Sequence, residues 1–247
     1  MVGGEMVVAY SFPEEDREYL TEKLAIVGEL AAGMAHEIRN PLTSIRGFLQ
    51  LLQTKFDPQA IEQEYFAIMF DELDRINNII KEFLSLAKPS QPQLQITPFG
   101  QLVAEALLLA EQEAIMYEVK LVQQLAPELP LLSLDPGQMK QVILNLTSNA
   151  IQAAGPGGMV IVSSYLDSAN AQVVTTVEDN GPGIPPEQLE LIFEPFYTTK
   201  ENGTGLGLTL SSRIVASHGG KIEVTSKVGE GSCFSIYLPV TSTGTSG

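Results

Sequence analysis

Apolar residues recur every three or four positions over residues 20–52, and this spacing restricts the fold more than any other feature of the chain. The steps are 4, 3, 4, 3, 4, 4, 3, 4 and 3 residues, a heptad pattern with one additional step of four. The pattern predicts a long helix over residues 14–55, bent where Pro41 removes a helix hydrogen bond. Its stripe consists of Leu20, Leu24, Val27, Ala31, Met34, Ile38, Leu42, Ile45, Leu49 and Leu52.

A second apolar stripe follows a break at 56–58 and predicts a helix over residues 59–87. Its members are Ile61, Tyr65, Met69, Leu73, Ile76, Ile80, Phe83 and Ala87. Two helices joined by a short turn form an antiparallel hairpin, which by itself leaves one side of each stripe in water. Pairing two hairpins into a four-helix bundle removes that exposure, so we predict a homodimer. The alternative is that the hairpin packs on the rest of its own chain.

The prolines of Lys88-Pro89-Ser90-Gln91-Pro92 end the helical part, because they stop a helix and favour extended chain. We therefore expect a helical domain over 14–88, a linker over 89–94 and a second domain over 95–240. In the second domain, helices are predicted over 99–117, 136–154 and 206–218, and strands over 119–124, 159–166, 172–178, 221–226 and 232–238. This mixed order favours a two-layer α/β sandwich over a doubly wound parallel sheet.

His36 lies two residues from the nearest stripe members on either side, so the predicted helix turns it toward solvent. A neutral imidazole is a competent nucleophile toward phosphorus, and Glu37 could act as its general base or hold its tautomer. Asn40, four residues after His36, shares its helical face and could position a water molecule or support the bend. Taken alone, an exposed histidine beside a glutamate is more often ordinary surface.

Asn145 and Asn149 stand four residues apart on a predicted helix, so both project from one face. Amide oxygens are hard ligands that suit Mg²⁺, an ion that usually bridges substrate phosphates. The pair therefore indicates a site for a metal–phosphate ligand, with an ordinary solvated helix face as the alternative.

Two glycine-rich turns follow along the chain, one at 179–183 and one at 203–207. Asp179, Gly181 and Gly183 lie directly after a predicted strand, where glycine lets backbone approach a ligand and a carboxylate can accept a hydrogen bond from an exocyclic amine such as that of adenine. Either turn alone would be commonplace.

Gly203, Gly205 and Gly207 lead into a predicted helix, whose first N–H groups attract phosphate. Lys200 stands just before them and could reach a terminal phosphate. The spacing matches neither the dinucleotide fingerprint nor the Walker pattern.

Composition excludes several classes of partner. The formal net charge is −16, which opposes binding to nucleic acid or anionic lipid. No apolar run approaches the roughly 18 residues of a membrane span, and the single cysteine, Cys233, cannot form an internal disulfide. We expect this portion to be cytoplasmic without membrane contact, and any anchor to lie in an N-terminal sensor region outside it. His218, before two glycines at a predicted helix end, is expected to cap that helix.

The order of these segments resembles the sensor histidine kinases of two-component signalling. Residues 36–42 (His-Glu-Ile-Arg-Asn-Pro-Leu) are similar to the family's phosphoacceptor box, and 145–150 to its N box. Residues 179–183, 193–196 and 203–207 resemble the first glycine box, the F box and the second glycine box.

The resemblance covers nearly all of residues 20–239, and chance cannot account for five boxes in the right order. The phosphoacceptor box and the Phe-Tyr-Thr-Thr-Lys segment further resemble the kinases that start sporulation phosphorelays in spore-forming bacteria.

The resemblance implies a Bergerat-type (GHKL) ATP-binding fold, with Asp179 reading adenine and Asn149 holding Mg²⁺. It implies that ATP phosphorylates His36 and that an aspartate on a response regulator then receives the phosphoryl group. The surface of the second helix could also bind a protein inhibitor, although nothing in the sequence specifies one.

Two rival classes remain. Related ATPases that use ATP as a conformational clamp carry a catalytic glutamate where this chain has Asn145, and an asparagine cannot act as that base. A non-catalytic dimeric scaffold would be expected to have lost some of the ATP boxes, and none is lost. Two departures from the family are a short segment between Phe196 and Gly203 and a serine, Ser232, where threonine is usual.

Overall fold

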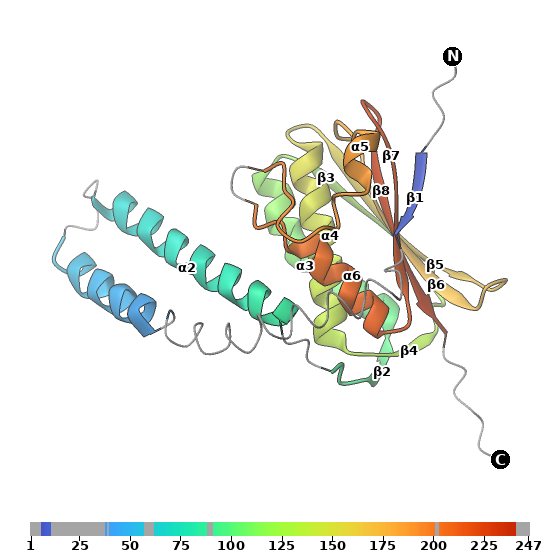
Figure 1. The fold of residues 1–247 in the computed structure, drawn as a ribbon, viewed down its shortest axis with the longest axis horizontal. Helices are drawn as coiled ribbons and strands as arrows, with labels where there is room; N and C mark the ends of the chain where they lie inside the picture. The colour runs from blue at the N-terminus through green and yellow to red at the C-terminus, as the bar shows by residue number, and fades with distance from the viewer. Residues whose placement is uncertain are drawn as a thin grey trace. The chain divides into compact units, whose positions relative to one another are not determined.

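The computed structural model describes residues 6–10, 38, 40–56, 62–87, 91–200 and 203–240. The chain divides into two compact units, drawn in Figure 1. One comprises Pro13–Ser90, and the other comprises Met1–Phe12 with Gln91–Gly247. No helix in the described ranges combines the length and apolarity that a membrane crossing requires.

The first unit contains a helix over 40–53 and helix α2 (Glu62–Ala87). Three contacts show that these helices run antiparallel. Arg46 pairs with Asp74, the Gln53 Nε2 group donates to Gln63 Oε1 over 2.9 Å, and the rings of Phe56 and Phe66 lie 5.5 Å apart. The predicted hairpin is therefore present in the described part of this unit.

The apolar stripes of the hairpin are only partly covered. Leu42 and Leu73 are buried, as their stripes predict. Tyr65 and Met69 of the predicted α2 stripe are exposed, whereas Phe66, which lies outside that stripe, is buried. This agrees with the expectation that a single hairpin leaves one side of each stripe uncovered. Several other large apolar side chains of the hairpin also remain exposed, namely Ile45, Phe48, Leu51, Leu52 and Ile68.

The second unit is a two-layer α/β sandwich, in which helices α3, α4 and α6 cover one face of a six-stranded sheet (Figure 1). The strand order is β1-β7-β8-β6-β5-β3, and only the β3–β5 pair is parallel. The predicted sandwich is confirmed, and the strands β5–β6 and β7–β8 pair antiparallel.

Element bounds lie close to those expected. The helices are α3 (Phe99–Met116), α4 (Pro136–Ala154) and α6 (Gly207–Ser217). The strands are β3 (Lys120–Leu125), β5 (Met159–Asp167), β6 (Gln172–Asp179), β7 (Lys221–Lys227) and β8 (Gly231–Pro239). Four short elements were not predicted: β1 (Met6–Tyr10), the β2 (Gln95–Pro98) and β4 (Leu131–Leu134) pair, and α5 (Pro186–Leu189).

Helix α4, which carries the paired asparagines, has a tightly defined start. Asp135 Oδ1 accepts hydrogen bonds from the N–H groups of Gly137 and Gln138, at 3.0 and 3.1 Å. His218 caps the end of α6, as predicted: its Nδ1–H donates to Ile214 O (2.7 Å), while its Nε2 accepts from the Asp135 N–H (2.9 Å). The end of α6 and the start of α4 are thereby held together.

Candidate functional site

The carboxyl group of Asp179 lies at the end of β6 and is 4 % exposed. Burial raises the pKa of Asp179, although the N–H groups of Gly181 and Ser232 favour the charged form by donating to it. The Gly181 donation measures 2.9 Å. A buried carboxylate with only part of its acceptor capacity satisfied is suited to a ligand that brings a further N–H donor.

Gly181 and Gly183 fix the turn that follows Asp179. A Cβ atom at Gly181 would lie 2.6 Å from Ala153 O on α4, and Gly183 has φ +71° against the backbone of Lys227. Only glycine suits both conditions, a close backbone approach and a left-handed conformation. The turn therefore rests directly on the last part of α4.

The β7–β8 hairpin holds the other side of this turn. The Gly229 N–H donates to Pro182 O over 2.7 Å, and the Ile184 N–H donates to Ser226 Oγ over 2.8 Å. The Ser226 hydroxyl in turn donates to Gly231 O over 2.9 Å. Neither Ser226 nor Gly231 was predicted as a supporting residue, because the contact joins segments about 40 residues apart in the sequence.

Asn145 and Asn149 are half-buried on α4, as their spacing predicts. Asn145 Nδ2 donates to Ser211 Oγ on α6 over 2.9 Å, and a Cβ at Gly207 would collide with the Asn145 side chain. Asn149 lies one turn before Ala153, the residue on which Gly181 rests. One end of α4 thus joins the Asp179 turn to the start of α6.

Residues 196–200 and 203–205, which the structure describes, lie in the loop between the F-box position and α6. The Phe196 N–H donates to Gly205 O over 3.0 Å. Gly205 has φ +68°, and the Phe196 backbone leaves no room for a Cβ there, so both conditions call for glycine. Within the loop, Thr198 Oγ1 accepts from the Lys200 N–H at 3.1 Å, and a Cβ at Gly203 would overlap that hydroxyl. On either side of the loop in sequence, Thr209 Oγ1 on α6 donates to the carbonyl of buried Phe193 over 2.8 Å.

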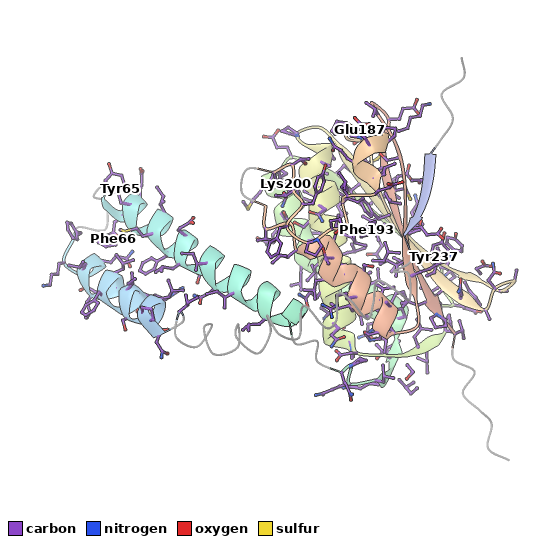
Figure 2. The ribbon with its side chains drawn as sticks, in the orientation of Figure 1. Tyr65, Phe66, Glu187, Phe193, Lys200 and Tyr237 are labelled. Carbon is purple, nitrogen blue, oxygen red and sulfur yellow. The ribbon has the colours of Figure 1, made fainter. Side chains whose placement is uncertain are left out.

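Lys200, labelled in Figure 2, connects this loop to α4. Its ammonium group donates to Asn149 Oδ1 at 2.7 Å and to Gln152 Oε1 at 2.6 Å. Loss of water around the ammonium group lowers the pKa of Lys200, and the negative charge of Glu113 acts in the opposite direction. The structure thus brings together two residues, Asn149 and Lys200, that the sequence placed in separate motifs.

The Asn149 oxygen fits a cation. It already accepts from a positive charge, and amide oxygen is a hard ligand of the kind Mg²⁺ prefers. Among the described residues, no group of three or more acidic, histidine or cysteine side chains could hold a metal by itself. Any Mg²⁺ here would therefore need oxygen ligands from a phosphate as well as from Asn149.

His36 and Glu37 lie outside the described residues. Asn40 is described and exposed near the start of the helix over 40–53, where its carbonyl accepts from the Ser44 hydroxyl at 3.2 Å. Two contributors to the site were not anticipated: Gln152, which holds Lys200, and Glu113, which holds Gln152. Gln152 and Glu113 belong to no recognisable motif, and their contact joins two helices 39 residues apart, so the sequence could not single them out.

Two family descriptions match the chain. "Histidine kinase-, DNA gyrase B-, and HSP90-like ATPase" matches residues 134–242, and "His Kinase A (phospho-acceptor) domain" matches residues 26–92. Sporulation kinase D of Bacillus subtilis (strain 168) is 41% identical over 227 residues, covering 92% of this chain and 44% of the relative. Sensor histidine kinases of enteric bacteria match at similar identity. The chain spans about half or less of the length of the curated relatives it matches.

Two solved structures are similar in sequence and fold. Full-length ShkA in complex with AMPPNP has a TM-score of 0.76 and 26% identity, covering 85% of this chain and 45% of that one. Histidine kinase ThkA in complex with response regulator protein TrrA has a TM-score of 0.66 and 28% identity, covering 96% of this chain and 79% of that one. With the five boxes and the sandwich that carries them, these matches show that the chain belongs to the sensor histidine kinase family, with a phospho-acceptor domain followed by a GHKL-type ATPase domain.

Proposed function

We propose that the protein is a histidine autokinase that transfers the γ-phosphoryl group of ATP to His36 and then to an aspartate of a response regulator. The observation that carries the proposal is the arrangement around the end of α4. The buried Asp179 carboxyl, the Asn149 amide oxygen and the Lys200 ammonium group all lie along this helix end. They supply acceptors for adenine and for a cation, and a positive charge for phosphate.

Each of the boxes then has a physical role. Asp179 accepts the exocyclic amine of adenine, and Gly181 and Gly183 let the backbone approach the base. The Gly203, Gly205 and Gly207 loop leads into α6, whose first N–H groups attract phosphate. Lys200 reaches the terminal phosphate as a mobile point charge. Asn145 lies against Gly207 at the start of α6 and holds this helix through Ser211.

Asn149 would hold Mg²⁺, which would neutralise phosphate charge when bound. The Asn149 oxygen and the phosphates would share the ion, and Lys200 would supply the remaining local positive charge. Catalysis of this kind consists mostly of positioning and charge stabilisation. The chain supplies both from rigid elements, α4 and β6, and from one loop.

The acceptor step belongs to the helical unit. The neutral imidazole of His36 attacks the γ-phosphorus, an N–P bond forms, and the bond to the leaving ADP oxygen breaks. Glu37 holds the imidazole in the attacking tautomer or accepts its proton. Segment 89–94 links the ATP-binding unit to the helical unit that carries His36. Asn40 then supports the regulator-directed chemistry or the helix itself, and an Asn40→Ala variant with unchanged regulator dephosphorylation would decide for the helix.

A homodimer is part of the proposal. The hairpin exposes Phe48, Leu51 and Ile68 at 68%, 64% and 64%, and a second copy would cover them in a four-helix bundle. The ThkA–TrrA complex supports a receiver domain as the second partner. The similarity to sporulation kinase D supports a sporulation phosphorelay as one pathway in which the reaction takes place.

The decisive test is incubation with γ-labelled ATP and Mg²⁺, comparing the wild type with His36→Gln. We expect label on the wild type alone, stable to base and lost in acid. Labelling of the His36→Gln protein with the same stability would overturn the assignment of the acceptor. ATP turnover with no phosphoprotein in either sample would instead favour a clamp-type ATPase, which the asparagine at 145 argues against.

A further inference from the structure

The contacts of Lys200 raise a question that the proposed nucleotide site does not answer. The ammonium group stands at 2.7 Å from Asn149 Oδ1, which is the oxygen assigned to Mg²⁺. An ammonium group and Mg²⁺ on the same amide oxygen would repel each other, so Lys200 has to leave Asn149 for the ion to bind there. Its second contact, with Gln152 Oε1 at 2.6 Å, involves no assigned metal ligand and can persist.

Hydrogen bonds from Gln152 to Glu113 and Ser148 orient its side chain for this contact. Its Nε2 group donates to Glu113 Oε1 over 2.9 Å and to Ser148 Oγ over 3.1 Å, while the Ser148 hydroxyl donates to the same Glu113 oxygen over 2.7 Å. A carboxylate can only accept here and an ammonium group can only donate. The amide must therefore point its nitrogen at Glu113 and its oxygen at Lys200.

The three supporting residues are fixed more firmly than the lysine they serve. Glu113, Ser148 and Gln152 are all half-buried and lie on α3 and α4, whereas Lys200 is exposed on the loop over 196–205. Charge-assisted hydrogen bonds are about twice as strong as neutral ones. The loop lysine is thus bound to a rigid, polarised acceptor.

We propose that Gln152, oriented by Glu113, is a positioning residue for Lys200. Before nucleotide binds, Gln152 and Asn149 share the ammonium group, which stands in for the metal. When ATP and Mg²⁺ bind, Lys200 leaves Asn149, stays hydrogen-bonded to Gln152 and is thereby kept beside the phosphates. This inference rests on the proposed function for the roles of Asn149 and ATP. The contact between Lys200 and Gln152 is independent of the proposed function.

The test compares Gln152→Leu, Lys200→Met and the double variant in the full chain. The matched control is Gln141→Leu, the same change at an exposed position of the same helix. Hydrogen exchange of the loop over 196–205 is measured without nucleotide. We expect exchange about tenfold faster in Gln152→Leu than in the wild type, from loss of one charged hydrogen bond. The Gln141→Leu protein is expected to match the wild type.

The second measurement is equilibrium binding of AMPPNP with Mg²⁺ by calorimetry. Gln152→Leu is expected to weaken binding several-fold, because the lysine is no longer held beside the phosphates. In the Lys200→Met background the same substitution is expected to have no further effect, because its action passes through the lysine. A structural role for Gln152 would weaken binding in both backgrounds.

The Glu113→Gln variant tests whether the charge of Glu113 is needed to orient the Gln152 amide. The amide retains an acceptor for Gln152 and Ser148, so we expect an intermediate rise in loop exchange. Equal loop exchange in the wild type and Gln152→Leu would overturn the inference, as would an undiminished effect of Gln152→Leu on AMPPNP binding in the Lys200→Met background. A wild-type protein that failed to bind AMPPNP would contradict the proposed function instead, and loop exchange would still decide the nucleotide-free contact.

Discussion

Asp179 shows how a single residue trades stability for ligand recognition. Its carboxyl group is buried at a strand end with two backbone N–H donors, and burial raises its pKa. The charged form is thus disfavoured in the nucleotide-free fold. A ligand that brings a further N–H donor would remove part of this cost, which is a physical reason for placing an acid there.

We expect Asp179→Asn to weaken AMPPNP binding by roughly 10- to 100-fold, as loss of a hydrogen bond to a charged group would. The folded protein is expected to be at least as stable as the wild type, because the amide keeps an acceptor for Gly181 and carries no charge to bury. Calorimetric binding and urea unfolding of the two proteins check this. A variant that unfolds readily would show that the carboxylate is structural.

The same pair of proteins gives a prediction on pH. The pKa of Asp179 is raised in the folded state, so the folded protein holds this proton more tightly than the unfolded chain. The resulting stability is fully present below the unfolded pKa and is lost as pH rises through the folded pKa. The stability advantage of Asp179→Asn over the wild type should therefore grow as pH rises through the acid range, as measured by urea unfolding at several pH values.

Thr147 is a second residue at which packing and polarity conflict. In the described part of the chain, its Oγ1 is the one buried side-chain polar atom without a hydrogen-bond partner. Valine has nearly the same shape, so Thr147→Val should raise the free energy of unfolding by about 1 kcal/mol. Thr147→Ser, which keeps the hydroxyl and loses the methyl group, should lower it. Destabilisation by valine in thermal unfolding would show that the hydroxyl is satisfied in solution.

At the scale of elements, helix α4 carries or supports most of the nucleotide site, and Asp135 sets its start. Asp135 Oδ2 also accepts from the Gln93 N–H at 2.9 Å, which ties the segment before β2 to this helix. Burial alone would raise the pKa of Asp135, but the N–H donors of Gln138, Gln93 and Gly137 bring it below the ordinary 3.8. The carboxylate thus stabilises the fold at neutral pH.

Asp135→Ala should lower the free energy of unfolding by roughly 1–2 kcal/mol, the usual effect of losing an N-cap. Asp135→Asn, which keeps a capping oxygen, should lose much less. Because the folded pKa of Asp135 is lowered, its contribution is present above the unfolded pKa and is lost as pH falls through the folded pKa. The difference between wild type and Asp135→Ala should therefore shrink in strong acid, which unfolding at several pH values can check.

The elements missed by pattern analysis are the short ones. Strands β1, β2 and β4 have five, four and four residues, too few for an alternating pattern to stand out. They are strands because they pair: β1 with β7, and β2 with β4. Long periodic elements such as α3 and β8 were predicted almost to the residue, since each repeats its pattern several times.

At the scale of the molecule, two units with different tasks share one chain. The hairpin leaves an apolar surface, whereas the sandwich buries its own core. We expect Phe48→Asp to convert a dimer into monomers, because a buried charge at the bundle interface is strongly unfavourable. Light scattering after size-exclusion chromatography checks the mass.

Gln50→Asp places the same charge on another face of that helix and is the matched control. It should remain dimeric, and Phe48→Asp should still bind AMPPNP, because the nucleotide site lies within the other unit. A dimeric Phe48→Asp protein would mean that the dimer does not bury Phe48.

The sequence by itself determined the two-part organisation, the long helices and strands, and the family, because periodicity and motif order are local properties of the chain. Tertiary structure decided the strand order, the addition of β1 to the sheet edge, and the approach of Gly181 to Ala153. It also brought Lys200 to Gln152 and Glu113, residues 48 and 87 positions away (200 − 152 and 200 − 113). Such contacts form only when separate elements pack together, so no local sequence pattern predicts them.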